Sequence, residues 1–527
     1  MRSQLSVLLA AVVAMSCLRP PPYQPPTVVV APEFRAVQDS TSNAVAGSVH
    51  HAATVYVGGS SPAPLADSQG VRLALGDAGG SMPVSHIAVP PAVERSAGPV
   101  RISTEAPDSP FWLELGDSAL VALVREALKE NPDVHVAESR LRAARASRKL
   151  SAFDFAPTVT ASAGVSTQRL SVAQLPGLSV QPPRQDLWDG GFDASWELDI
   201  FGRITQSVRA QGAFAQSAEE DLEDVQLSLA AEVARTYFEL RGAQGELEVA
   251  RRNAENQRRT LALTQERLDA GRGTAFDTER AKAELSLTLA ATPEIEARIA
   301  ASQYRIAVLL GRSPGELPSA LATSGKLPPL PDVVHVGSPK QLVRHRPDVI
   351  SAERRLAARS MLVSAAEREY LPRFSIGASV GYTSSSLDGL GNTGTSRYVV
   401  GPVISWPFLN LGRVGTRVEG AEAEEEAARA QYQSAVLGAV EEAETSIVTY
   451  QHTRARLRDL SDAVQASTHA LELAQLRFQE GVTDFLQVLD AQRTLLSAEN
   501  QLAVGRTAAA TALVAVYKAV GGGMPER

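Results

Sequence analysis

Few residues in this chain are grouped in a way that would support bond-making chemistry. The eight histidines show neither the HExxH spacing of a zinc protease nor another metal-ligand pattern, and the chain has no phosphate-binding glycine loop or nucleophile elbow. Acidic pairs such as Glu441 and Glu442 fall in long amphipathic segments, where a solvated helix face is the simplest interpretation. The sequence therefore predicts a protein that is not an enzyme and that uses no metal ion or cofactor.

The single cysteine, Cys17, has the clearest chemical role. It follows a short charged start and an apolar run from Leu5 to Met15, a secretory signal that is too short to span a bilayer. Residues 14–17, Ala-Met-Ser-Cys, are similar to a bacterial lipobox, whose cysteine is diacylated and becomes the mature N-terminus. We predict a signal peptide at 1–16 and a covalent lipid on Cys17; an ordinary signal peptide with an incidental cysteine is the alternative. No other segment reaches the roughly 18 consecutive apolar residues of a membrane helix.

Composition and charge narrow the class of protein. Hydrophobic residues make up 44% of the chain but aromatic residues only 5%, a mixture that favours long helices over an all-β domain. The net charge of −8 and the lack of a basic cluster argue against a nucleic-acid partner, because phosphate neutralisation needs clustered Lys and Arg. Residues 17–110 are rich in Pro, Ala, Ser, Gly and Val, and we interpret them as a lipidated leader that is partly extended or disordered.

Two long windows without proline predict long helices, the first from Arg184 to Thr292 and the second from Phe408 to Met524. In both windows apolar residues recur in alternating steps of three and four, which places them in one seam for packing against a neighbouring helix. The seams are Leu222, Val225, Leu229, Val233, Tyr237 and Leu240, and Leu457, Leu460, Val464, Ser467, Leu471, Ala474 and Phe478. A helix of about 65 residues would be about 100 Å long, which suits a bundle or a tube. A shorter helix is predicted to start after Asp117, which can cap it, and to end before Pro132.

The chain also contains an internal repeat. Residues 131–134, Asn-Pro-Asp-Val, match residues 346–349, Arg-Pro-Asp-Val, at an offset of 215. Further matches at an offset of 210 are Trp196 with Trp406, Gly271 with Gly481, Ala281 with Ala491 and Leu285 with Leu495. Because the matches keep the same order, we predict two copies of one structural unit, the first at 111–325 and the second at 326–523.

Between the matching positions lie four segments with the alternation of β-strands. Apolar and polar residues alternate in each, so each strand would have one apolar and one polar face. The apolar positions are Val159, Ala161, Ala163 and Val165; Trp188, Phe192, Ala194, Trp196 and Leu198; Phe374, Ile376, Ala378, Val380 and Tyr382; and Tyr398, Val400, Pro402, Ile404 and Trp406. This pattern matches the lipid-facing and water-facing sides of a membrane barrel, and a soluble sheet packed on helices is the alternative.

Several strings of residues carry a family resemblance. They are Arg346-Pro347-Asp348-Val349 with Ala352-Glu353-Arg354-Arg355-Leu356, Asp199-Ile200-Phe201-Gly202-Arg203, Leu409-Asn410-Leu411-Gly412-Arg413, and Phe478-Gln479-Glu480-Gly481 with Val488-Leu489-Asp490-Ala491-Gln492-Arg493. Together with the lipobox region, they resemble the TolC/OprM (NodT-type) outer-membrane factors, in particular the lipoprotein subgroup of RND efflux systems. The resemblance covers about 110–520, nearly the whole mature chain.

The resemblance implies a mainly α fold with a membrane β-barrel. In the family, each protomer of a homotrimer gives four strands to a shared barrel of twelve, and long helices form a periplasmic α-barrel. Oligomerisation is also a physical requirement if the strands lie in lipid, because four strands cannot close a pore and an open edge is not tolerated there. The implied partners are a periplasmic membrane-fusion adaptor, an inner-membrane pump of the RND class and the lipid of the Gram-negative outer membrane.

The resemblance also implies a pore gate at the periplasmic end. By position, Asp490 corresponds to a pore-ring aspartate and Leu486 to an apolar constriction, and such rings would attract cations and narrow the path. Asp277, in the first repeat, would hold the closed state against a neighbouring helix. Gln487 and Thr483 stand where some relatives have a second acid and an arginine, which puts an arginine–carboxylate lock in doubt. Solvated helix-face carboxylates are the alternative for both aspartates.

Gly271 and Gly481 are predicted at helix-to-helix turns, because glycine tolerates a positive φ. Since the family meets its adaptor at these turns, residues 267–275 and 477–485 are candidates for docking. A purely structural turn accounts for the glycines equally well.

We therefore expect an outer-membrane channel, the exit duct of a tripartite efflux system that exports small molecules such as drugs. Type I protein secretion and metal efflux use the same kind of subunit and stay open as alternatives. A soluble periplasmic coiled-coil adaptor or scaffold is an alternative of another class, and it should lack the alternating strands. A secreted hydrolase with helical extensions would need a catalytic constellation that the sequence does not contain.

Overall fold

The computed structural model describes residues 30–36, 101–105, 109–171, 180, 183–316, 321 and 325–522. Cys17 lies outside these residues, so the predicted signal peptide and lipid stay predictions. The chain divides into two compact units. The strand unit contains the described residues of 132–227 and 343–440, and the helix unit those of 31–131, 228–342 and 441–527.

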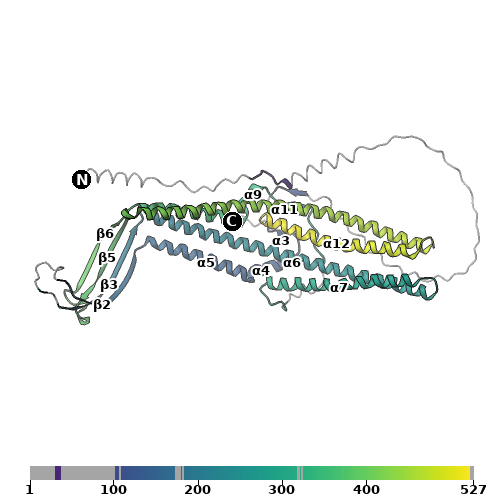
Figure 1. The fold of residues 1–527 in the computed structure, drawn as a ribbon, viewed down its shortest axis with the longest axis horizontal. Coiled ribbons are helices and arrows are strands. Elements are labelled where there is room, and N and C mark those ends of the chain that lie inside the picture. Colours follow the sequence, from purple (N-terminus) through teal and green to yellow (C-terminus); the bar gives the residue numbers. More distant parts are fainter. Residues whose placement is uncertain are drawn as a thin grey trace, which may run out of the picture. The chain divides into compact units, whose positions relative to one another are not determined.

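The same order of elements occurs twice (Figure 1). The first set is α5 (Pro132–Ala152), β2 (Thr158–Gln168), β3 (Gln185–Leu198), α6 (Arg203–Asp269) and α7 (Ala275–Leu309). The second set is α10 (Pro347–Glu367), β5 (Arg373–Ser384), β6 (Ser396–Ser405), α11 (Leu411–Gln479) and α12 (Phe485–Ala519). Equivalent helices have equal or similar lengths, 21 residues for α5 and α10, 67 and 69 for α6 and α11, and 35 for α7 and α12. The duplicated order agrees with the sequence repeat, and the boundary between 325 and 326 stays a prediction.

Shorter elements complete the described chain. They are β1 (Arg101–Ser103), α3 (Phe111–Glu114), α4 (Ser118–Glu130), β4 (Val333–His335) and α9 (Pro339–His345), with 3₁₀ turns η1 (Phe153–Phe155), η3 (Arg368–Tyr370), η4 (Leu387–Gly389) and η5 (Phe408–Asn410). The predicted start of α4 is confirmed, since the Asp117 side chain accepts hydrogen bonds from the N–H groups of Ala119 and Leu120. The helix of the first window extends further than the lack of proline predicted, because α7 continues through Pro293. The start of that window is not helical, because Gln185–Leu198 form β3, and the helices of the second window lie within its predicted bounds.

The strand unit is built around an antiparallel sheet in the order β2-β3-β5-β6 (Figure 1). All four predicted strands are confirmed. Their register aligns the apolar positions across the sheet, as the row Val159, Ala194, Ala378 and Val400 shows. The next row, Thr160, Asp193, Ser379 and Val399, belongs to the opposite face. The sheet therefore has one apolar face and one mainly polar face.

The apolar face of this sheet is open in the single chain. Its valines and aromatic residues include Val159, Phe192, Val380 and Val400, which are 61%, 58%, 57% and 67% exposed. Soluble monomers rarely expose apolar residues in a continuous patch of this kind, because burying them is favourable. The face is therefore a surface that needs a partner or an apolar solvent.

Side-chain hydrogen bonds fix the ends of the strands. The indole Nε1 of Trp196 donates to the carbonyl of Phe155 at 2.8 Å, and that of Trp406 donates to the carbonyl of Tyr370 at 3.0 Å. The two bonds occupy equivalent places in the two repeats. At the corner between β3 and α6, the carboxylate of Asp199 accepts the N–H groups of Ile204 and Thr205 at 2.9 and 2.8 Å, which caps the helix. The strands thus pass into helices through fixed corners.

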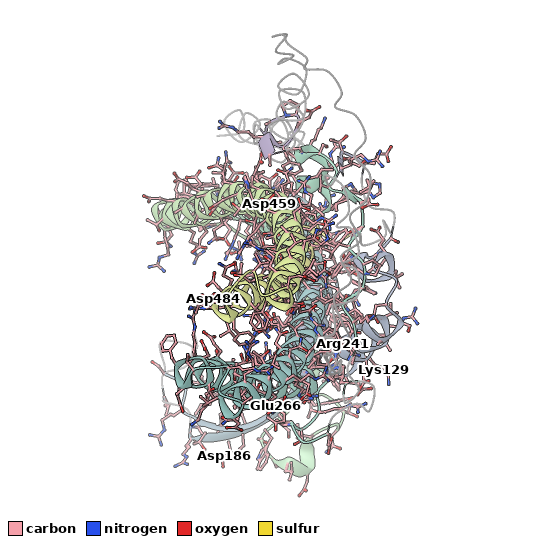
Figure 2. All side chains as sticks on the ribbon, turned by 90° about the vertical axis from the view of Figure 1, so that its right-hand side faces the viewer. Lys129, Asp186, Arg241, Glu266, Asp459 and Asp484 are labelled. Atoms are coloured by element: carbon pink, nitrogen blue, oxygen red, sulfur yellow. The ribbon has the colours of Figure 1, made fainter. Side chains whose placement is uncertain are left out.

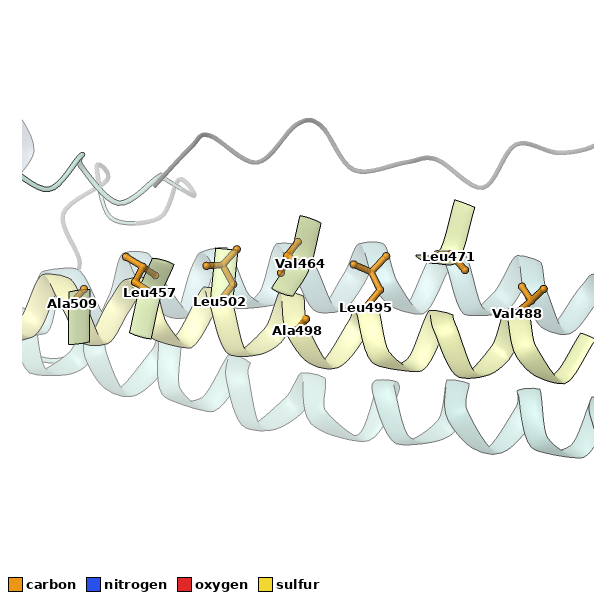
Figure 3. Close-up of a cluster of buried hydrophobic side chains, with 8 residues drawn as sticks. All are labelled: Leu457, Val464, Leu471, Val488, Leu495, Ala498, Leu502 and Ala509. Atoms are coloured by element: carbon orange, nitrogen blue, oxygen red, sulfur yellow. The ribbon is translucent and has the colours of Figure 1, made fainter. Parts of the chain in front are cut away.

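In the helix unit, α11 and α12 pack through an apolar seam (Figure 3). The buried residues of the seam are Leu457, Val464 and Leu471 of α11 and Val488, Leu495, Ala498, Leu502 and Ala509 of α12. Leu460, Ala474 and Phe478 are partly buried against it. The heptad pattern of the second window is confirmed by this packing, and in the first window Leu229, Val233, Tyr237 and Leu240 are buried.

Two short stretches of the predicted leader region lie in the helix unit. Phe34 is 1% exposed, and the N–H groups of Arg35 and Ala36 donate to the carboxylate of Glu444 in α11 at 2.7 and 2.9 Å. Residues 101–103 form β1, which pairs in parallel with β4. These contacts join residues far apart in the sequence, and local composition gave no sign of them.

The helices α6 and α12 approach closely at Gly242. A Cβ atom at this position would overlap Oγ1 of Thr507 and lie 2.6 Å from its Cγ2 and 2.8 Å from its Cβ. The Thr507 Cβ is next to the helix backbone, so it cannot move aside cheaply. We predict that Gly242→Ala lowers the free energy of unfolding by about 1–3 kcal/mol, measured by thermal or denaturant unfolding in detergent.

Gly245 is the matched control, because it lies in the same helix and a Cβ there would meet no atom within 4 Å. Gly245→Ala should be neutral or stabilising by up to about 1 kcal/mol, because alanine has the higher helix propensity. Equal effects of the two substitutions would contradict the close approach of α6 and α12.

Candidate functional site

Each long helix is joined to the following shorter helix by the same glycine turn. Gly271 has φ 66° and Gly481 has φ 70°, a left-handed conformation that glycine adopts without strain. In the first turn, the N–H of Gly271 donates to Leu268 at 2.9 Å and that of Arg272 donates to Arg267 at 2.8 Å. In the second turn the equivalent bonds measure 3.1 and 2.9 Å. Both turns are Schellman motifs, which satisfy the last carbonyls of a helix.

The two turns are linked by an arginine stacked on an aromatic ring. The guanidinium carbon of Arg267, at the end of α6, lies 4.5 Å from the ring centre of Phe478 at the end of α11. Phe478 in turn packs against Phe485, the first residue of α12, with ring centres 5.2 Å apart. A cation over an aromatic face is attracted by the ring quadrupole, so this stack holds the two turns together. Arg267 belongs to the predicted docking segment 267–275, but its contact with Phe478 was not predicted, because the contact joins residues of different repeats.

Asp277 takes part in a capping box at the start of α7. The hydroxyl of Thr274 donates to the Asp277 carboxylate at 2.7 Å, and the N–H of Asp277 donates to the Thr274 hydroxyl at 3.3 Å. The carboxylate therefore has a local structural task. At the equivalent place before α12, Asp484 is the N-cap residue but its side chain makes no capping bond.

A groove of about 820 Å³ lies beside the second turn, and both residues predicted for the gate of the second repeat line it. Its lining is Arg280, Ala466, Ser467, Ala470, Leu473, Ala474, Arg477, Leu486, Gln487, Asp490, Ala491 and Thr494. Asp490 is thus brought together with Leu486 and with the cations Arg280 and Arg477. Figure 2 views the helix unit from the end that carries the turns and labels Asp484 before α12 and Glu266 near the end of α6.

Polar side chains fix α12 against α6. The carboxylate of Glu499 accepts a hydrogen bond from Arg252 at 3.1 Å, although the Glu499 side chain is only 8% exposed. The Thr260 hydroxyl lies 3.3 Å from the side-chain oxygen of Gln492. A carboxylate buried to this degree needs a charged partner. Glu499 was not among the residues predicted from the sequence, and its place in an otherwise apolar helix stripe is the signal that would have identified it.

Within the described ranges of the chain, no group of three or more His, Cys, Asp or Glu side chains is placed to hold a metal ion. None of the helices in this part of the chain combines the length and the apolar character needed to cross a membrane.

The capping box at Thr274 and the lack of a capping bond at Asp484 predict different effects of mutation on the two turns. We predict that Thr274→Ala lowers the stability of the first turn of α7 by about 1 kcal/mol, because the capping bond is lost. The equivalent change Asp484→Ala should have a smaller effect, since that side chain makes no capping bond. Hydrogen exchange of the amides in the first turns of α7 and α12 measures both effects, and faster exchange only in the Asp484→Ala variant would refute this assignment.

The known proteins that this chain resembles are outer-membrane proteins and channels. The solvent efflux pump outer membrane protein SrpC of Pseudomonas putida is 31% identical over 412 residues, which are 77% of this chain and 86% of that protein. Outer membrane protein OprJ of Pseudomonas aeruginosa is 30% identical over 448 residues, 83% of this chain and 93% of that protein. The solved structure of the outer-membrane channel OprN is 36% identical, with a TM-score of 0.75, and the match covers 83% of this chain and 99% of that one.

The family model described as "Outer membrane efflux protein" matches residues 123–312 and 338–522. These ranges include the four strands, both long helices and both glycine turns. The resemblance of the sequence strings is therefore confirmed over both repeats. The chain belongs to the outer membrane efflux protein family, and it is an efflux channel of the Gram-negative outer membrane.

Proposed function

We propose that this outer-membrane efflux channel works as a homotrimer, in which the strands of three protomers form one closed barrel of twelve strands. The observation that carries the proposal is the two-faced sheet, whose register aligns apolar residues on one side and mainly polar residues on the other. In the proposed barrel the apolar face contacts lipid and the polar face lines a water-filled bore.

The edges of the sheet support a trimer over a monomer. β2 and β6 are the outer strands, and each has one side without a strand neighbour in the described chain. An unpaired backbone group costs several kcal/mol in lipid, so a spanning sheet must close on itself. Since four strands are too few for a wet bore, closure needs further copies of the same sheet.

We place the gate of the duct at the second glycine turn. The groove there already contains Leu486 and Asp490, which in a trimer would form an apolar ring and an acidic ring around the axis. The acidic ring would favour cations and the apolar ring would narrow the path. The proposed role of Asp277 in the gate is indirect. Its carboxylate accepts a hydrogen bond from Thr274 at the start of α7 and so stabilises the first turn.

The two turns are also the proposed docking sites for a periplasmic adaptor. Residues 267–275 and 477–485 contain Gly271 and Gly481, and exposed apolar side chains beside them, Phe276 and Val482, are 68% and 65% exposed. Such side chains at the end of a helix pair suit an interface with another protein. The adaptor would connect the duct to an inner-membrane pump, for which the RND class is our proposal.

Small molecules are the proposed cargo. Relatives of the chain are named for solvent efflux and toluene efflux in Pseudomonas putida, which supports small apolar compounds over proteins. A duct of this kind needs no bond-making residue, because it supplies only a path. Acylation of Cys17, which lies outside the described residues, would add a membrane anchor to the barrel.

Two adjacent valines of β6 test the barrel. Val400 belongs to the apolar face and Val399 to the polar face, and they are 67% and 69% exposed. We predict that Val400→Arg destabilises the membrane-inserted trimer by about 2–4 kcal/mol, because it places a charge against lipid, whereas Val399→Arg is tolerated in the bore. The measurement is the yield of heat-modifiable trimer in the outer-membrane fraction. Equal yields from the two variants, or a water-soluble monomer from the parent protein, would contradict the proposed barrel.

The gate is tested by conductance in planar bilayers. We predict that Asp490→Ala lowers both the cation conductance of the resting channel and its preference for cations over anions, because a ring of three carboxylates that concentrates cations is removed. Glu294→Ala, which removes an exposed carboxylate of α7 outside the groove, is the control and should leave both unchanged. Equal conductance and cation preference in the parent and Asp490→Ala would remove Asp490 from the gate, and a lack of single-channel current in both would count against a duct.

A further inference from the structure

An arginine on the polar face of the sheet reaches across two strands. Arg397 of β6 donates from Nε and Nη2 to the Asp189 carboxylate of β3 at 3.0 and 2.7 Å. Its Nη1 donates to the Ser379 hydroxyl at 2.8 Å, and its Nε also approaches the Thr383 hydroxyl at 3.0 Å. Thr383 donates to the same carboxylate at 2.7 Å. The guanidinium is therefore held at a fixed place by partners on two strands.

Glycines open the path for this side chain. In the register, Arg397 stands opposite Gly381 of β5, and Gly381 stands opposite Gly191 of β3. A Cβ at Gly191 would come 2.5 Å from the carbonyl oxygen of Val380, so the two strands approach closely in this row. Both residues opposite Arg397 in this row are glycines, so no side chain blocks the guanidinium as it passes over β5 to Asp189.

The pairing of Arg397 with Asp189 determines which charges remain on the polar face of the sheet. Asp193 lies on the same face and accepts a hydrogen bond from the neutral hydroxyl of Ser162 at 3.0 Å, so its charge is not cancelled by that bond. Glu197, further along β3, is paired with Arg203 at 2.9 Å. Asp189 and Arg397 neutralise each other, which leaves Asp193 as the net charge of this part of the face.

We propose that Arg397 cancels the charge of Asp189 at the outer end of the bore, so that the unpaired carboxylate charge of Asp193 determines the potential of this face and cationic and neutral cargo passes in preference to anionic cargo. The inference rests on the proposed function, because it requires the polar face to line the bore. Residues 189, 383 and 397 lie near the strand ends that are not joined to the long helices, and these ends face outward if the helices extend into the periplasm. Three copies of the pair would surround the bore at one level.

A reporter cysteine on the polar face measures this potential without use of the gate. Gly164 of β2 is exposed, stands directly opposite Asp189 in the register, and has open space for a Cβ, so a thiol there lies within a Debye length of the pair. Because Cys17 is the only native cysteine, Gly164→Cys adds one new thiol, and its parent without the change gives the background. The thiol is treated in intact cells with a cationic and an anionic thiosulfonate reagent, and the ratio of the two modification rates reports the local potential.

Charge variants in the reporter background should move this ratio in opposite directions. Arg397→Gln keeps hydrogen-bond donors but removes the positive charge, and we expect the cation-to-anion ratio to rise about two- to fourfold. Asp189→Asn should lower it by a similar factor, and the double variant should return it close to the parent value. Thr383→Val removes a hydrogen bond without changing charge, so it controls for loosening of the sheet and should leave the ratio unchanged.

The outcomes separate this inference from the function on which it rests. If Gly164→Cys reacts but the ratio is the same in all variants, or moves equally in Thr383→Val, the role of the pair is refuted while the proposed bore is unaffected. If Gly164→Cys reacts with neither reagent in intact cells, the polar face does not line an open bore, and the proposed function fails. Trimer yield on gels confirms that each variant is assembled, and the double variant restores charge balance if a single variant does not fold.

Discussion

The free outer edges of β2 and β6 are the constraint on which the proposed assembly depends. Lipid offers no hydrogen-bonding partner, so a strand that spans it must find its second neighbour within protein. The described sheet leaves both edges open and exposes its apolar face, so it is incomplete as a single chain. In the proposed trimer each β2 edge pairs with the β6 edge of the next copy. Folding of the sheet and association of the protomers then become one equilibrium, and sheet stability depends on protomer concentration. The tryptophans 196 and 406, bonded to backbone carbonyls in both repeats, keep the strand ends in place for that closure.

The helix unit uses two kinds of contact, and they constrain different things. α12 packs on α11 through aliphatic side chains, and such packing is favourable over a range of small displacements because burial has no direction. Against α6, α12 is held by the Arg252–Glu499 ion pair and by Thr260 with Gln492, which are satisfied only near one register. Gly242 adds a steric limit at the closest approach of α6 and α12. The apolar seam therefore stabilises the packing of α12 on α11, and the polar and glycine contacts determine the position of α12 along α6.

Local sequence patterns predicted the elements better than their contacts. Alternation gave all four strands, and the long proline-free windows gave α6 and α11, because both signals depend on neighbours in sequence. The Gly271 and Gly481 turns were also predictable, since a positive φ at a helix end favours glycine. The pair of Arg397 with Asp189 could not be predicted, because it depends on β5 lying between β3 and β6. Docking of Phe34 was not predictable either, since the sequence around Phe34 has no apolar periodicity to indicate a buried side chain.

The two glycine turns show how the two copies of a duplicated unit can differ in local stability. Their backbones close with the same pair of hydrogen bonds, but their side chains are satisfied to different degrees. In the first turn, Thr274 and Asp277 satisfy each other and anchor the start of α7. In the second, the cap residue Asp484 makes no capping bond, and the hydroxyl of Thr483 is buried without a hydrogen-bond partner. The first turn of α7 also contains such a hydroxyl, that of Thr278, so the two turns differ in the capping box alone. A lost cap costs about 1 kcal/mol, so the described conformation of the second turn is the less stabilised of the two. A turn held in this way needs less free energy to rearrange, which favours the second turn as the place where a closed duct opens.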